Sequence, residues 1–189
     1  MAEAAGATVL RLVKNRGKSR AMNEGFRYVR NQGFDAVITI DGDGRHDPSE
    51  IPKFLEVYDR TGFPLLAGNR MHRARKLRFC RRWVNRAMAA WLCRISDVYM
   101  PDPPCGFRFF RGDVLPFIIA QDTRYCAEFE MLLNIAQRNI RMGSVRITHR
   151  HRKAASKLVP VIDIIRFISV VIADHRRHRE QDRAATESI

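Results

Sequence analysis

The chain has 189 residues, 46% of them hydrophobic, a composition that suits one globular domain with a substantial core. Its formal net charge of +14 indicates an anionic partner: a nucleic acid, a phosphorylated ligand or an anionic membrane surface. No uncharged apolar run approaches the length of about 18 residues that a transmembrane helix needs, so none is predicted. The N-terminal residues show no signal peptide pattern, and we expect a chain on the cytoplasmic side.

Strand-like and helix-like patterns alternate along most of the chain, and this is typical of an α/β fold with a mostly parallel sheet. We expect one domain over residues 1–174 and a basic tail over 175–189. The predicted strands are 8–13, 36–40, 65–67, 107–110 and 144–148, the last one starting after a break at Gly143. The predicted helices are 19–31 with Ser19 as its cap, 48–59 with Asp47 as its cap, 78–96, 113–120, 128–139 and 159–173.

The four cysteines, Cys80, Cys93, Cys105 and Cys126, lack the spacings of zinc or redox sites. We therefore expect reduced thiols that are mostly buried.

The most informative motif is Asp41-Gly-Asp-Gly-Arg-His-Asp-Pro48, which directly follows the apolar run 36–40. The run predicts a buried strand, and the glycines predict an abrupt turn at its end. Asp41 and Asp43 would then face a common point at the edge of the sheet. Carboxylate oxygens placed in this way suit Mg²⁺ or Mn²⁺, which keeps its other positions for water and substrate phosphates. The alternative interpretation is a simple Asp-Gly turn without a ligand.

Further motifs occur in a regular order on both sides of this turn. They are Asn15-x-Gly-Lys-Ser-x-Ala-Met-Asn-x-Gly25, Gly68-Asn-Arg70, Asp102-x-x-Cys-Gly-Phe-Arg108, Glu128-x-Glu130 and Ser156-Lys157. Together with the acidic turn, they resemble the family 2 glycosyltransferases of the GT-A fold. The resemblance covers about residues 8 to 167 and is strongest to the dolichol- and undecaprenyl-phosphate sugar synthases.

The resemblance implies an inverting, metal-dependent transfer of a sugar from a nucleotide-sugar to a polyprenyl phosphate or a related membrane lipid. Asp41 and Asp43 match the metal and donor positions, with Asp43 as the first choice for the direct ligand of Mg²⁺ or Mn²⁺. Lys18 matches a position near the donor nucleotide, and an ordinary solvated lysine is its alternative interpretation. Arg152 and Lys157 match the mobile basic loop that closes over the diphosphate.

The acceptor side is represented by Arg70, Arg81 and Asn85, which match positions that hold the acceptor's phosphate in the lipid-phosphate synthases. Arg81 and Asn85 would share one helix face, so both can contact a single anion. The family commonly has Ser in place of Asn85, and Asn can still donate a hydrogen bond. Arg108 ends a loop that lines the acceptor side in the family.

The candidate catalytic residues are Asp43 at the metal, Asp102 in the acceptor loop and Glu130 at a helix start. A carboxylate can serve as the base for a hydroxyl acceptor, whereas a phosphate acceptor is already ionised and needs none. Glu130 can equally be explained by the favourable position of an acid near a helix N-terminus. Transfer to a hydroxyl of a glycan or lipid is therefore the alternative reaction.

Two motifs of a complete family domain are missing: a Pro-x-x-Asn segment and an Asp-Asp-Gly-Ser turn, which lie in the first two βα units. At about 30 residues per unit, we expect the chain to lack roughly the first 60 to 70 residues of the complete domain. The 189 residues alone are then expected to be weakly active or inactive, and an inactive paralogue is an alternative.

The expected partners are a nucleotide-sugar, a lipid phosphate and a membrane surface. The apolar segment 158–173 can lie on that surface or pack in the core. We therefore expect a peripheral protein at the cytoplasmic face of the membrane. The non-enzyme alternative is a basic nucleic-acid-binding module, but the chain has no helix-turn-helix, zinc or RNA-binding signature, so no nucleic acid is expected.

Overall fold

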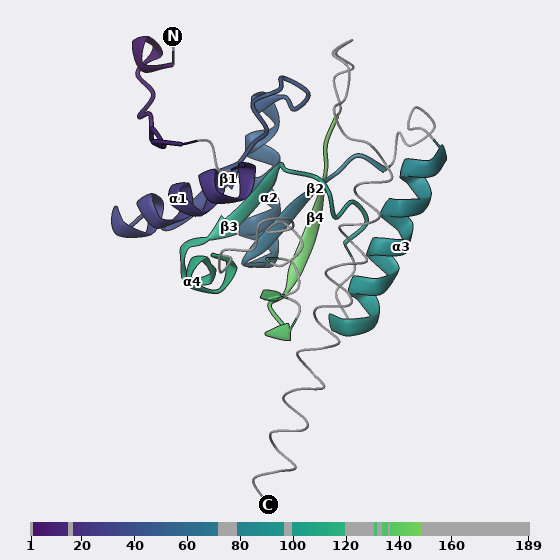
Figure 1. Cartoon of the computed structure of the whole chain (residues 1–189). Helices are drawn as coiled ribbons and strands as arrows, with labels where there is room; N and C mark the ends of the chain where they lie inside the picture. The colour runs from purple at the N-terminus through teal and green to yellow at the C-terminus, as the bar shows by residue number, and fades with distance from the viewer. Residues whose placement is uncertain are drawn as a thin grey trace, which may run out of the picture.

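The structure, a computed structural model, describes residues 2–14, 17–71, 79–96, 100–119 and 131–148, the last range without 132, 133 and 136. The strands of this part form one four-stranded sheet in the order β1-β3-β2-β4, with helices around it (Figure 1). The strands are β1 (Ala36–Thr39), β2 (Leu65–Asn69), β3 (Arg108–Arg111) and β4 (Met142–Arg146). The α/β prediction is confirmed.

Strand β3 runs antiparallel to both of its neighbours, β1 and β2, while β2 and β4 are parallel. It follows that β1, β2 and β4 all point in one direction and that β3 alone is reversed. The prediction of a mostly parallel sheet therefore holds for strand direction, although the reversed strand makes the sheet mixed. Arg108 of β3 pairs with Thr39 on one side and with Ala67 on the other, which sets the register.

The reversal of β3 brings four chain segments to one edge of the sheet. The N-terminal end of β3 lies where the C-terminal ends of β1, β2 and β4 lie. That edge therefore collects residues 40–47 after β1, 70–71 after β2, 100–107 before β3 and 147–148 after β4.

The helices cover both faces of the sheet (Figure 1). Helix α1 (Lys18–Asn31) and the short α4 (Leu115–Ile118) pack on one face, and α2 (Ile51–Thr61) packs on the other. Helix α3 (Phe79–Ser96) lies at the opposite side of the molecule from α1. The 3-10 helices are η1 (Glu3–Ala5), η2 (Pro48–Glu50) and η4 (Gly112–Val114).

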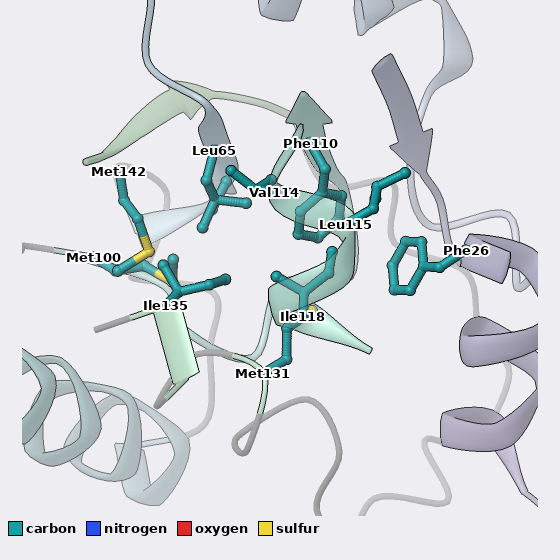
Figure 2. Close-up of a cluster of buried hydrophobic side chains, with 11 residues drawn as sticks. Phe26, Leu65, Met100, Phe110, Val114, Leu115, Ile118, Met131, Ile135 and Met142 are labelled. Atoms are coloured by element: carbon teal, nitrogen blue, oxygen red, sulfur yellow. The ribbon is translucent and has the colours of Figure 1, made fainter. Parts of the chain in front are cut away.

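Side chains alternate along the strands and divide the core into two clusters. On the face of α1 and α4 they meet Phe26, as Figure 2 shows, and on the other face they meet Phe54 of α2. The first cluster contains Phe26, Leu65, Ala67, Met100, Phe110, Val114, Leu115, Ile118, Met131, Ile135 and Met142. The second contains Phe54, Leu66, Cys105, Phe107, Phe109, Val145 and Ile147. Burial on both faces explains why β2 begins with the continuous apolar run Leu65-Leu-Ala67.

Most predicted elements in the described ranges are confirmed to within a few residues, and two glycines account for the main differences at the ends. The N-cap of α1 is Gly17 at φ 86°, and Ser19 lies inside the helix. Gly143 lies within β4, where a Cβ atom would come within 2.7 Å of the Phe63 ring and 2.8 Å of Leu66. It therefore permits close packing and does not break the strand.

The predicted strand 8–13 is wrong, because these residues form no strand in the structure. Val9, Leu10 and Leu12 are 38–46% exposed, and Val13 is fully exposed. A strand needs a partner for its backbone groups, and no described strand pairs with this segment. The alternating pattern alone was therefore not enough to form a strand.

The predicted helix 128–139 is described only in part, and the helix 159–173 and the tail 175–189 lie outside the described residues. Within the described ranges, no helix is long and apolar enough to cross a membrane.

Candidate functional site

The carboxylate of Asp41, just beyond β1, is in contact with a residue of its own turn and with residues from two other segments. Lys18 Nζ, at the start of α1, lies 2.6 Å from Asp41 Oδ1, and His46 Nε2 lies 3.6 Å from Oδ2. A Cβ atom on Gly106 would lie 2.6 Å from Oδ1. The absence of a side chain at Gly106 is therefore what lets the carboxylate rest against the loop before β3.

Asp41 is held as a carboxylate. The hydrogen bond with His46 and the contacts with Lys18 lower the pKa of Asp41 well below its usual range, although partial burial acts in the opposite direction. The side chain of His46 is only 2% exposed, and its ring packs edge-on against Phe107 with centroids 5.4 Å apart. A buried imidazole in a fixed position thus orients the carboxylate.

Asp43 lies on the outer side of the same turn, with 48% of its side chain exposed. Its Oδ1 accepts a hydrogen bond from the backbone N–H of Arg45 at 3.0 Å, and its Oδ2 lies 3.3 Å from Arg45 Nε. The first of these contacts closes a local Asx-type turn.

The chemistry of the turn fits a divalent ion that is shared with a substrate. Within the described ranges, no group of three or more His, Cys, Asp or Glu side chains is arranged to hold a metal by itself. Mg²⁺ commonly takes only one or two protein carboxylates and completes its shell with water and phosphate oxygens. Asp41 and Asp43 supply two ionisable carboxylates on one turn, which is a donor set of this partial kind.

A buried charge pair, Arg70 with Asp102, lies at the same edge. Arg70 Nε donates to Asp102 Oδ2 at 2.6 Å, Nη2 donates to Oδ1 at 2.9 Å, and the Arg70 backbone N–H donates to Oδ2 at 3.1 Å. Burial disfavours the charge on Arg70, but the hydrogen bonds with Asp102 outweigh it and raise the pKa of the guanidinium. This bidentate pairing with Asp102 fixes the orientation of the Arg70 guanidinium.

Both carboxylate oxygens of Asp102 are therefore engaged with Arg70, and the residue is only 1% exposed. This geometry favours Asp102 as a residue that positions Arg70. A direct catalytic role for Asp102 stays a prediction.

Arg108 on β3 is 1% exposed, and its Nη2 donates to the carbonyl oxygen of Pro103. Its Nε and Nη1 have no hydrogen-bond partner in the described part of the chain. Its role toward the acceptor also stays a prediction. In the loop before β3, burial raises the pKa of the Cys105 thiol to about 11. Cys93 and Cys105 are free thiols, as expected.

Glu50, which no sequence motif singled out, contributes to the structure near the site. It is 4% exposed, and its two carboxylate oxygens accept the backbone N–H of Thr148 at 3.1 and 3.0 Å. This contact ties η2, which follows the acidic turn, to the end of β4. No local pattern signals the pairing, because 98 residues separate the two partners.

The side chains of the remaining predicted site residues lie outside the described part of the structure. Glu130, Arg152 and Lys157 lie outside the described residues. Arg81 and Asn85 belong to α3 by their backbone, and their side chains lie outside the described part. The structure thus brings together Lys18, Asp41, Asp43, Arg70, Asp102 and Arg108 at or beside one edge.

The family model described as "Glycosyl transferase family 2" matches residues 1–120 of the chain. The chain belongs to glycosyl transferase family 2. An undecaprenyl-phosphate mannosyltransferase of Micrococcus luteus is 25% identical to this family 2 chain over 157 residues. A dodecaprenyl-phosphate galacturonate synthase of Rhizobium johnstonii is 24% identical over 145 residues.

The alignment with the Micrococcus protein covers 80% of this family 2 chain and 64% of that relative. The alignment with the Rhizobium protein covers 77% of this chain and 41% of that relative. The chain therefore spans less than two thirds of the length of either relative.

Among solved structures, the chain is similar to glucosyl-3-phosphoglycerate synthase from Mycobacterium tuberculosis in complex with Mn²⁺ and UDP-glucose. The TM-score is 0.50 and the identity 18%, over 81% of this chain and 56% of the other. At this identity the likeness shows the fold, and the GT-A prediction is confirmed.

Proposed function

We propose that this chain forms the metal-binding and acceptor-binding part of a glycosyltransferase. The reaction is the inverting transfer of a sugar from a nucleotide-sugar to a polyprenyl phosphate, at the cytoplasmic face of a membrane. The observation that carries the proposal is the meeting of two charged groups at one edge of the sheet. These groups are the Asp41–Asp43 turn and the fixed Arg70–Asp102 pair.

On the donor side, Asp41 and Asp43 would hold Mg²⁺ or Mn²⁺. Such an ion neutralises the negative charge that develops on the leaving nucleoside diphosphate. His46 orients Asp41, and Gly106 leaves room for its carboxylate. The solved Mycobacterium structure of the same fold is a complex with Mn²⁺ and UDP-glucose, which agrees with this assignment.

On the acceptor side, Arg70 supplies a positive charge whose orientation is set by Asp102. A phosphate acceptor would accept hydrogen bonds from the guanidinium N–H groups that do not bond to Asp102, and its ionised oxygen needs no base before it attacks the sugar. The names of the Micrococcus and Rhizobium relatives, both of which specify a polyprenyl phosphate, support the same acceptor class. A hydroxyl acceptor would instead require a base such as Glu130.

The test offers purified protein a panel of radiolabelled nucleotide-sugars, with undecaprenyl phosphate and undecaprenol as parallel acceptors. We expect slow, metal-dependent transfer of label to the phosphate acceptor alone. Removing a ligand of a Lewis-acidic ion costs several kcal/mol, so Asp43→Ala should lower the rate about 100-fold or more. The matched control is Asp59→Asn, which changes an exposed acid on α2.

The acceptor class has a second readout that does not depend on turnover. Farnesyl phosphate should bind the protein measurably more tightly than farnesol, and Arg70→Met should remove most of that difference. Arg60→Met, at an exposed position on α2, should leave it unchanged. Label in undecaprenol alone, or equal binding of the two farnesyl compounds, would refute a phosphate acceptor.

A further inference from the structure

Both carboxylates of the acidic turn are paired with cations that belong to the chain itself. Lys18 Nζ lies 2.6 Å from Asp41 Oδ1, and Arg45 Nε lies 3.3 Å from Asp43 Oδ2. The formal charges of these four side chains cancel. A divalent ion arriving at the turn would therefore meet a site whose negative charge is already balanced.

Lys18 can be displaced more readily than Arg45. The Lys18 side chain is 53% exposed, whereas that of Arg45 is 17% exposed and its own backbone N–H also holds Asp43. Lys18 is the first residue of α1, and a cation at a helix N-terminus is disfavoured by the helix dipole. Its flexible stem can carry the ammonium group away from Asp41 without moving the helix.

A metal ion held by Asp41 would compete with Lys18 for the carboxylate. At 2.6 Å the ammonium group donates directly to Asp41 Oδ1. A metal ion held by Asp41 would repel a positive charge so close to it.

We propose that Lys18 is an internal counter-ion of the acidic turn, which occupies Asp41 until a divalent ion displaces it and thereby weakens metal binding. The proposal rests on the metal role of Asp41 in the proposed function. Once displaced from Asp41, the ammonium group can pair with an anionic ligand of that ion. Metal and diphosphate should therefore favour each other's binding, and the metal alone should bind weakly.

The experiment measures binding of Mn²⁺ alone, from the electron paramagnetic resonance signal of the free ion. Lys18→Met keeps the apolar stem and removes the charge, so Mn²⁺ should bind about tenfold more tightly, as expected for loss of one competing charged hydrogen bond. Lys18→Arg restores a cation and should bind Mn²⁺ like the unmodified protein.

The matched control is Lys53→Met. Lys53 is 49% exposed and lies 2.7 Å from Glu50, so it resembles Lys18 in exposure and pairing without contacting the acidic turn. Unchanged or weaker Mn²⁺ binding in Lys18→Met would overturn the proposal. Equal tightening in both lysine variants would also overturn it, because that result indicates a general effect of net charge.

Asp41→Asn separates this proposal from the function on which it rests. If Asp41→Asn weakens Mn²⁺ binding while Lys18→Met does not tighten it, only the counter-ion role is wrong. If Asp41→Asn has no effect on Mn²⁺ binding in the Lys18→Met background, the assignment of Asp41 as a metal ligand is wrong. The counter-ion role of Lys18 is then wrong as well. Circular dichroism of each variant checks that the fold is retained.

Discussion

The surroundings of Asp41 show how much of this site depends on single residues, two of which are distant from Asp41 in sequence. The motif from Asp41 to Pro48 predicted a carboxylate at the end of a strand, and the structure agrees. The residues that place the carboxylate are Lys18, His46 and Gly106. Gly106 matters through the space that it leaves, a property that no pattern of side chains reveals.

We predict that Gly106→Ala destabilises the protein. The added methyl group would overlap the Asp41 carboxylate, so either the turn or the loop before β3 must move. Overpacking of this kind costs about 1–3 kcal/mol in the free energy of unfolding, which urea denaturation measures.

Gly42→Ala is the control for this prediction. Gly42 stands between Asp41 and Asp43, yet a Cβ atom there would meet nothing within 4 Å. The free energy of unfolding should therefore change little in Gly42→Ala. If both variants lose equal stability, the close approach of Gly106 to Asp41 is not the cause.

At the level of elements, periodicity predicted helices and strands well wherever apolar residues face a packed layer. Helix α2 and strands β1, β2 and β3 begin and end within a few residues of their expected positions. Asp47 caps the start of η2 by accepting the backbone N–H of Ser49, as its place before Pro48 indicated. Periodicity failed for residues 8–13, because alternation describes a strand's faces and not its neighbours.

The link between η2 and the end of β4 leads to a prediction about Glu50. Glu50→Gln leaves one oxygen to accept from Thr148 and removes the charge that strengthens both bonds. We expect a loss of about 1 kcal/mol in the free energy of unfolding. We also expect faster hydrogen exchange of the Thr148 amide, measured by NMR.

Two controls isolate that contact. Glu56→Gln changes an exposed acid on α2, and Lys53→Met removes the ion-pair partner of Glu50 while keeping its bonds to Thr148. Neither should alter exchange at Thr148. An unchanged amide in Glu50→Gln would show that the end of β4 is held in another way.

For the whole molecule, the most prominent property is the net charge of +14. The acidic turn and the Arg70–Asp102 pair are locally balanced, so the excess positive charge lies elsewhere in the chain. A surplus of this size attracts anionic surfaces over about one Debye length. It agrees with the proposed placement at a membrane face.

We predict that the protein binds vesicles containing phosphatidylglycerol and releases them as salt increases. Binding in a sedimentation assay should be strong at about 0.05 M salt and largely lost near 0.5 M, because screening shortens the range of the attraction. Vesicles of phosphatidylcholine alone are the control and should bind little. Equal binding to both vesicle types, unaffected by salt, would contradict an electrostatic membrane contact.

The sequence by itself determined the α/β class, the bounds of most described elements and the family resemblance, because these depend on local periodicity and short motifs. Only the tertiary structure decided that β3 is reversed, which brings the loop before it to the edge where Asp41 and Arg70 lie. It also decided that Lys18 rests on Asp41, that Asp102 holds Arg70 and that Glu50 holds Thr148. These contacts join distant segments, so they follow from strand order and direction, which local patterns along the chain do not encode.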